Sequence, residues 1–192
     1  MREGYLNVDF APHHSPDLVA DVTHLPMLPA DYFEEIVAQD VLEHFERGKT
    51  QAALQEWARL LSPTGILFIR VPSLLHMADL LVKAEGAGAE EAEKIIHLFY
   101  GTQAYTGDYH LAGFTASSLA RHLSSSGLHV DSVGLRDGWL FEVFATKQAR
   151  RPAKWPVSET ERPNRVLDEV YHSTSWRITA PLRKLRQLTR FR

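Results

Sequence analysis

Residues 50–73 read TQAALQEWARLLSPTGILFIRVPS, and two patterns of apolar residues lie on either side of a break. In residues 50–61 the apolar side chains recur with helical spacing and would form one stripe, at Leu54, Trp57, Ala58 and Leu61. Pro63 and Gly65 then interrupt the helix. Residues 66–71 are almost continuously apolar, which is typical of a parallel strand covered on both faces. The stretch therefore predicts a helix, a turn and a buried strand.

Upstream of this stretch, three short apolar runs each end in polar residues. We predict strands at residues 5–9, 17–22 and 35–39. Strands that are separated by long connections and helices indicate an α/β fold with a mainly parallel sheet.

Downstream, residues 73–84 and 89–100 have helical patterns, and Thr115 is suited to cap a further helix that ends at Gly127. Two strands, at residues 130–135 and 140–146, follow with the turn Arg136-Asp137-Gly138 between them. This turn predicts an antiparallel pair that closes the sheet.

The composition is that of a soluble globular protein, with 44% hydrophobic and 23% charged residues in 192. No apolar run approaches the roughly 18 residues that a membrane span needs. The absence of cysteine excludes disulfides and thiolate metal sites, and fits a cytoplasmic location. Ten histidines are present without a recognisable ligand spacing, so the sequence predicts no metal site.

Charge is distributed unevenly along the chain. Residues 1–146 carry nine Lys and Arg against 20 Asp and Glu, a net charge of −11, whereas residues 147–192 carry 12 against four, a net +8. The acidic body argues against a nucleic-acid partner, because phosphates would be repelled. We predict a domain at residues 1–146, a proline-containing linker at 147–163 and a basic helical tail at 164–192.

Polar side chains follow the predicted strands at their carboxyl ends, where open α/β sheets bind ligands. Asp9 ends the first of these strands, and its two carboxylate oxygens could accept hydrogen bonds from the vicinal hydroxyls of a ribose. Asp21-Val22 and Gln39-Asp40 follow the next two strands. Any one of these residues could equally be a turn or cap residue, so the prediction depends on their order.

Three motifs carry a resemblance to a known family: Gly-Tyr-Leu-Asn-Val-Asp at residues 4–9, Gln-Asp-Val-Leu-Glu-His at 39–44 and Leu-Ser-Pro-Thr-Gly at 61–65. Their order resembles that of class I S-adenosylmethionine-dependent methyltransferases of a bacterial type 11-like branch. The resemblance implies a Rossmann-like fold with S-adenosyl-L-methionine as cofactor. It places Asp9 at the ribose, Asp21 and Val22 at the adenine, and Gln39 and Asp40 near the methionine part.

Residues 100–115 are rich in Tyr, Asp and His, and they resemble the insert that covers the active-site mouth in the same branch. The resemblance implies His110 as a general base and an acceptor pocket formed by Tyr105, Asp108 and Tyr109, with His44 beside it. The alternative is an ordered loop in which these aromatic and polar groups have structural roles.

The first strand of that family and its Gly-rich loop have no counterpart, since no glycine lies between Gly4 and Gly48. Three outcomes are open. The protein begins upstream, the strands ending at Asp9 and Gln39 pair directly, or another chain supplies the missing strand. We favour an N-terminally truncated methyltransferase, so that activity of this chain depends on whether the cofactor site is complete.

Residues 172–186, HSTSWRITAPLRKLR, resemble the C-terminal segment of bacterial glycosyltransferases of polysaccharide biosynthesis. A basic amphipathic helix there would contact an anionic membrane surface, at its cytoplasmic face, or an acidic protein, unless the tail is simply solvated. We therefore expect O-methylation of a saccharide or envelope-glycan acceptor. The competing function is a non-catalytic methyltransferase-like interaction module in a polysaccharide-assembly complex.

Overall fold

The computed structural model describes residues 4–105, 107–148 and 154–156. Contacts within the chain divide it into units of residues 1–160 and 161–192, so every described residue belongs to the first unit. The predicted tail at residues 164–192 lies outside the described residues, as does most of the predicted linker at 147–163.

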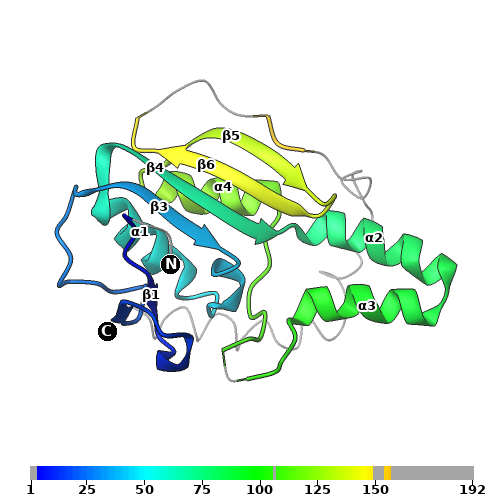
Figure 1. The fold of residues 1–192 in the computed structure, drawn as a ribbon. Coiled ribbons are helices and arrows are strands. Elements are labelled where there is room, and N and C mark those ends of the chain that lie inside the picture. The colour runs from blue at the N-terminus through cyan, green and yellow to red at the C-terminus, as the bar shows by residue number, and fades with distance from the viewer. Residues whose placement is uncertain (1–3, 106, 149–153, 157–192) are drawn as a thin grey trace, which may run out of the picture. The chain divides into compact units, whose positions relative to one another are not determined.

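A four-stranded mixed sheet forms the centre of the fold (Figure 1). Its strands are β3 (Phe33–Gln39), β4 (Leu61–Pro72), β6 (Leu140–Thr146) and β5 (His129–Arg136), in that spatial order. β3 and β4 are parallel, whereas β6 is antiparallel to both β4 and β5. The predicted antiparallel pair at the end of the sheet is thus confirmed.

β4 begins five residues earlier than its apolar pattern predicts, at Leu61 instead of Ile66. Phe33 of β3 lies opposite Leu61, and Glu35 lies opposite Ile66, so residues 62–65 bulge out of the ladder. A Cβ atom on Gly65 would lie 2.8 Å from the carbonyl oxygen of Phe33, so glycine is what permits the strands to meet here. The predicted turn therefore exists as a bulge within the strand.

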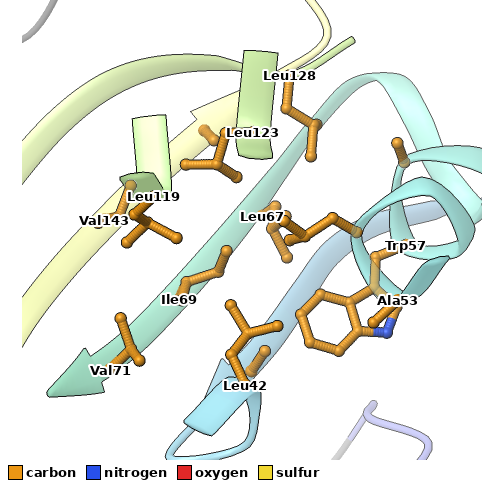
Figure 2. Close-up of a cluster of buried hydrophobic side chains, with 14 of the residues drawn as sticks. Leu42, Ala53, Trp57, Leu67, Ile69, Val71, Leu119, Leu123, Leu128 and Val143 are labelled. Carbon is orange, nitrogen blue, oxygen red and sulfur yellow. The ribbon is translucent and has the colours of Figure 1, made fainter. Parts of the chain in front are cut away.

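The core lies where two helices pack on the sheet, α1 (Thr50–Leu60) and α4 (Ala116–Ser125). Figure 2 shows Trp57 of α1 and Leu119 of α4 next to Leu67 and Ile69 of β4. Leu67, Ile69 and Leu119 are fully buried. The apolar stripe predicted for residues 50–61 is therefore the face of α1 that covers the sheet.

Thr115 caps α4, as predicted. Its hydroxyl oxygen accepts from the Ser118 N–H (3.2 Å), and the Thr115 N–H donates to Ser118 Oγ (2.9 Å), which forms a capping box. The helix ends at Ser125, and Gly127 has the positive φ of 74° that favours glycine after a helix.

Two helices, α2 (Leu74–Ala87) and α3 (Ala89–Tyr100), follow β4 and contact each other. Gly88 separates them with a φ of 133°. α2 and α3 confirm the helices predicted at residues 73–84 and 89–100. In the part of the chain that the structure describes, no helix combines the length and hydropathy that crossing a membrane would require.

The N-terminal strands are much shorter than predicted. β1 (Val8–Asp9) and β2 (Leu18–Val19) pair in parallel over two residues and form a separate two-stranded sheet, with a 3-10 helix, η1 (Pro12–His14), between them. β1 does not pair with β3. The outcome in which these two edges join directly is therefore wrong. Among the described residues, no strand occupies the second edge of β3.

Candidate active site

A cavity of about 420 Å³ lies beside the carboxyl ends of β1, β2 and β3. Because these strand ends meet at one edge, the polar residues that follow them can face a common space. Six of the ten residues predicted for the site line this cavity: Asp9, Asp21, Val22, Asp40, His44 and Tyr105. The structure adds apolar side chains to its wall, among them Val8, Phe10, Val41, Phe45 and Leu111.

Asp9 is the last residue of β1, and both of its carboxylate oxygens have partners. Oδ1 accepts a hydrogen bond from the Ala11 N–H (2.8 Å), and Oδ2 lies 2.8 Å from Nδ1 of His14. Burial alone would raise the pKa of Asp9, but these hydrogen bonds and the nearby His13 outweigh it and hold the pKa below its usual value. Asp9 is therefore a carboxylate at neutral pH, with lone pairs left for further donors.

Asp21 follows β2 and forms the first residue of a tight turn. Its Oδ1 accepts from both the N–H (2.9 Å) and the hydroxyl (2.7 Å) of Thr23, and Lys49 Nζ lies 3.6 Å from Oδ2. Burial opposes ionisation, yet the Thr23 hydrogen bonds and Lys49 together lower the pKa of Asp21. Two carboxylates from neighbouring parallel strands thus face one cavity, as the sequence predicted.

β3 ends at Gln39, and Gln39 and the following Asp40 have different surroundings. Asp40 lines the cavity with a left-handed φ of 53°, and both of its oxygens accept from the guanidinium of Arg70. Gln39 is exposed, pairs with Arg70 in the strand ladder and is not among the residues that line the cavity. A direct contact of Gln39 with a ligand in this cavity would require the side chain to move.

The loop from residue 100 to 112 lies close to the N-terminal segment. Tyr105 contacts the rings of His13 and His14, with centroid distances of 5.5 and 5.4 Å. A Cβ atom on Gly107 would lie 2.5 Å from Phe10 Cζ, so this glycine allows the loop to approach the cavity wall. Burial, with the nearby Asp108 and Asp9, raises the pKa of Tyr105, which keeps its hydroxyl protonated at neutral pH.

Asp108, Tyr109 and His110 come from the same loop but do not line the cavity. Asp108 accepts a hydrogen bond from the hydroxyl of Thr102, and Tyr109 is 43% exposed. His110 is half-buried, and its ring packs edge-on against His44 at a centroid distance of 4.9 Å. Burial and the neighbouring His44 lower the pKa of His110, so its imidazole is neutral at pH 7.

Sequence reasoning missed Glu43, which is 1% exposed and lies in the 3-10 helix η2 (Leu42–His44). Burial raises its pKa to about 8, and the nearby Asp40 acts in the same direction, while its own backbone N–H and Arg70 oppose them. Lys49 was also missed. No sequence pattern points to Lys49. Glu43 lies inside the motif at residues 39–44, for which the sequence predicts roles only at Gln39, Asp40 and His44.

Residues 6–69 match the family Methyltransf_11, described as "Methyltransferase domain". This segment resembles a methyltransferase domain. It contains Asp9, Asp21 and Asp40, which line the cavity, and spans 64 of the 192 residues.

One solved structure supports the fold at low sequence identity. A "possible exported protein" from Bordetella parapertussis is 12% identical with a TM-score of 0.50, and the match covers 74% of this chain and 52% of that one. It supports a Rossmann-like arrangement of helices around a central sheet. No curated protein matches this chain.

Two methyltransferase structures with bound SAH are similar at lower TM-scores. The trans-methyltransferase CalH is 18% identical (TM-score 0.44), with 66% of this chain and 34% of that chain covered. The magnesium protoporphyrin IX methyltransferase ChlM from Synechocystis PCC 6803 is also 18% identical (TM-score 0.43), with 67% and 49% covered. The chain thus spans between about a third and about half of the length of these three proteins.

Proposed function

We propose that this chain binds S-adenosyl-L-methionine in the cavity and transfers its methyl group to a hydroxyl oxygen of a saccharide acceptor. The observation that carries the proposal is the position of Asp9 and Asp21. They follow adjacent parallel strands, both are ionised, and they line a cavity large enough for a nucleoside, within a segment that matches the methyltransferase domain family.

In this proposal Asp9 accepts hydrogen bonds from the ribose hydroxyls. His14 already occupies one of its oxygens, so a ribose would share or replace that hydrogen bond. The apolar groups Val22 and Phe45 supply surface for the adenine ring, and Asp21 supplies an acceptor for its amine.

The reaction is an in-line displacement. A lone pair on the acceptor oxygen attacks the sulfonium methyl carbon, the C–S bond breaks, and S-adenosylhomocysteine leaves as the acceptor loses its hydroxyl proton. Holding the two reactants in line supplies most of the rate, so the protein's main task is positioning. In this proposal the hydroxyl proton passes to the imidazole pair of His44, which lines the cavity, and His110, whose ring contacts that of His44.

The acceptor class has support from the sequence alone. The tail at residues 172–186 resembles that of polysaccharide-biosynthesis glycosyltransferases, which favours a small-molecule or glycan acceptor handled in the cytoplasm, at the inner face of the membrane. A basic tail that holds the chain near such an acceptor would raise the local concentration of the two reactants.

Calorimetric titration of the full chain with S-adenosylhomocysteine tests the proposal. We expect saturable binding that Asp9→Asn weakens roughly 10- to 100-fold, because hydrogen bonds to a charged acceptor contribute about 1.5–3 kcal/mol. Asp137→Asn is the matched control, since Asp137 lies in the β5–β6 turn and is exposed. Equal affinities of the two variants would contradict the assigned role of Asp9.

The open edge of β3 supports the second candidate, a non-catalytic interaction module. The described residues contain no strand that pairs with the second edge of β3 and no glycine-rich loop beside the cavity to hold the carboxypropyl group of the cofactor. No binding of S-adenosylhomocysteine by the folded chain would favour this module over the enzyme.

A further inference from the structure

Glu43, His44 and His110 bring a carboxyl group and two imidazoles together beside the cavity. Each residue offers one atom that can bind a metal, and these three atoms all lie within 4.8 Å of one another. Glu43 and His44 are neighbours in η2, whereas His110 comes from the loop after α3. The grouping therefore depends on the fold and is not visible as a sequence motif.

Backbone hydrogen bonds fix the two segments against each other. The carbonyl oxygen of Glu43 accepts from the N–H groups of both Leu111 (2.7 Å) and Ala112 (3.0 Å). The N–H of His110 donates to the carbonyl oxygen of Tyr100 (3.2 Å). His110 is thereby held next to Glu43 by main-chain contacts that do not use either side chain.

The carboxyl group of Glu43 is buried, and one of its oxygens is not hydrogen-bonded within the described residues. The residue is 1% exposed, and among the described residues its Oε2 has no hydrogen-bond partner. A buried polar atom of this kind is destabilising when it is left unpaired. A bound cation would compensate for this cost directly.

The imidazole of His44 is oriented in the way that metal ligands usually are. Its Nδ1 lies 3.2 Å from the carbonyl oxygen of Tyr109, and its ring packs edge-on against that of His110. An N–H that donates to a carbonyl sets the tautomer and leaves the second nitrogen with a free lone pair. For His44 this second nitrogen is Nε2.

We propose that Glu43, His44 and His110 bind one divalent transition-metal ion at the wall of the cavity. One carboxylate and two imidazoles are a ligand set typical of zinc, manganese and iron(II) and unlike the all-oxygen shell that Mg²⁺ prefers. Ligand atoms around a tetrahedral zinc are roughly 3.4 Å apart, given bond lengths of about 2.1 Å. Small rotations of the three side chains would close the observed spacing.

The role of this ion in catalysis rests on the proposed function, whereas its binding does not. His44 lines the cavity, so a free coordination position on that side would bind the acceptor hydroxyl and lower its pKa. The hydroxyl proton then passes to water, and the oxygen attacks the methyl group of the cofactor. This assignment replaces the general-base role predicted for His110, because the ring nitrogen would coordinate the ion instead.

Titration of the tag-free, chelator-treated full chain with Zn²⁺ tests the site without cofactor or acceptor. We expect about one equivalent to bind, with affinity reduced roughly tenfold or more in Glu43→Gln and in His110→Gln, since each loses one of three ligands. His97→Gln is the matched control, because His97 is 71% exposed on α3. Co²⁺ added to the same proteins should give a visible absorption band in the wild type and in His97→Gln only.

Circular dichroism shows whether each variant is folded. If Glu43→Gln does not fold, His110→Gln alone tests the metal site. Absence of stoichiometric Zn²⁺ binding, or equal binding by His97→Gln and both ligand variants, would overturn the proposal. Zn²⁺ binding by a chain that does not bind S-adenosylhomocysteine would support the metal site and contradict the methyltransferase function. The two conclusions therefore fail separately.

Discussion

The four-stranded sheet and the β1–β2 pair are held in place by different kinds of interaction. β4 is paired along both edges, and Leu67, Ile69 and Val71 are fully buried on it. β1 and β2 pair over only two residues each, and Val19 is 53% exposed. Backbone pairing and apolar burial therefore stabilise the sheet, whereas the β1–β2 pair depends on what surrounds it.

Polar contacts from α1 hold the segment that follows β2. Nε1 of Trp57 donates to the carbonyl oxygen of Val22 (3.0 Å), and the guanidinium of Arg59 donates to those of Leu25 (2.9 Å) and Leu28 (3.1 Å). Asp9 and Asp21 thus belong to the part of the molecule with the smaller apolar core, whereas Asp40 follows β3 of the sheet. We expect Asp9 and Asp21 to be able to shift without unfolding of the sheet.

The largest effect is expected from Ile69→Ala in the middle of β4. Ile69 is fully buried between Ala38 and Val143 on the neighbouring strands, so its truncation removes apolar contacts and leaves a cavity. We expect the free energy of unfolding to fall by about 2–5 kcal/mol, as measured by chemical denaturation. Val19→Ala on β2 is the control and should change it by less than about 0.5 kcal/mol.

An intermediate effect is expected from Arg59→Met, which removes the donors that hold residues 25–28. It also leaves the 12%-exposed side chain of Glu56 without the guanidinium that lies 2.7 Å away. We expect a loss of about 1–3 kcal/mol, together with faster hydrogen exchange in residues 20–32 and unchanged exchange in β4. Equal acceleration in β4 would show that the two regions unfold as one unit.

The helices and the final antiparallel pair were predictable because local patterns determine them. The spacing of Leu54 and Trp57, the cap at Thr115 and the turn at Asp137-Gly138 each act within a few residues. Strand bounds were less predictable, because they depend on the partner. β4 extends back to Leu61 because Phe33 of β3 lies opposite Leu61 and pairs with it.

The candidate site was predictable to the extent that it follows strand ends. Asp9 and Asp21 follow adjacent parallel strands, so their meeting at one edge could be expected from order alone. Gln39 instead lies within the β3 ladder, where side chains alternate between faces. The burial of Glu43 against the loop at His110 is a contact between distant segments, which no local pattern in the sequence encodes.

A smaller and pH-dependent change in the stability of residues 20–32 is expected from Glu56. The guanidinium of Arg59 is the main cause that lowers the pKa of this carboxyl, against the opposing effect of burial. Its contribution to stability is therefore present above the unfolded pKa, near 4.5, and is lost as the pH falls through the lower folded pKa.

Hydrogen exchange of residues 20–32, compared between wild type and Glu56→Gln, measures this effect. The wild type should lose protection in acid below about pH 4.5, while the variant should be less protected throughout and depend less on pH. An unchanged slope in the variant would assign the pH dependence to another carboxyl group.

The smallest effect is expected from Thr23→Val beside the cavity. The change removes the hydroxyl that donates to Asp21 Oδ1 but keeps the Thr23 N–H that donates to the same oxygen, and it preserves side-chain shape. Because this hydrogen bond is exposed, we expect the free energy of unfolding to change by about 0.5 kcal/mol or less.

The same hydroxyl orients the Asp21 carboxylate, so Thr23→Val should weaken binding of S-adenosylhomocysteine a few-fold in calorimetry even though stability hardly changes. Thr23→Ser, which keeps the hydroxyl, should bind as the wild type does. A loss of stability without a loss of affinity would reverse the distinction drawn between the two regions, because the β1–β2 side would then serve the fold more than the ligand.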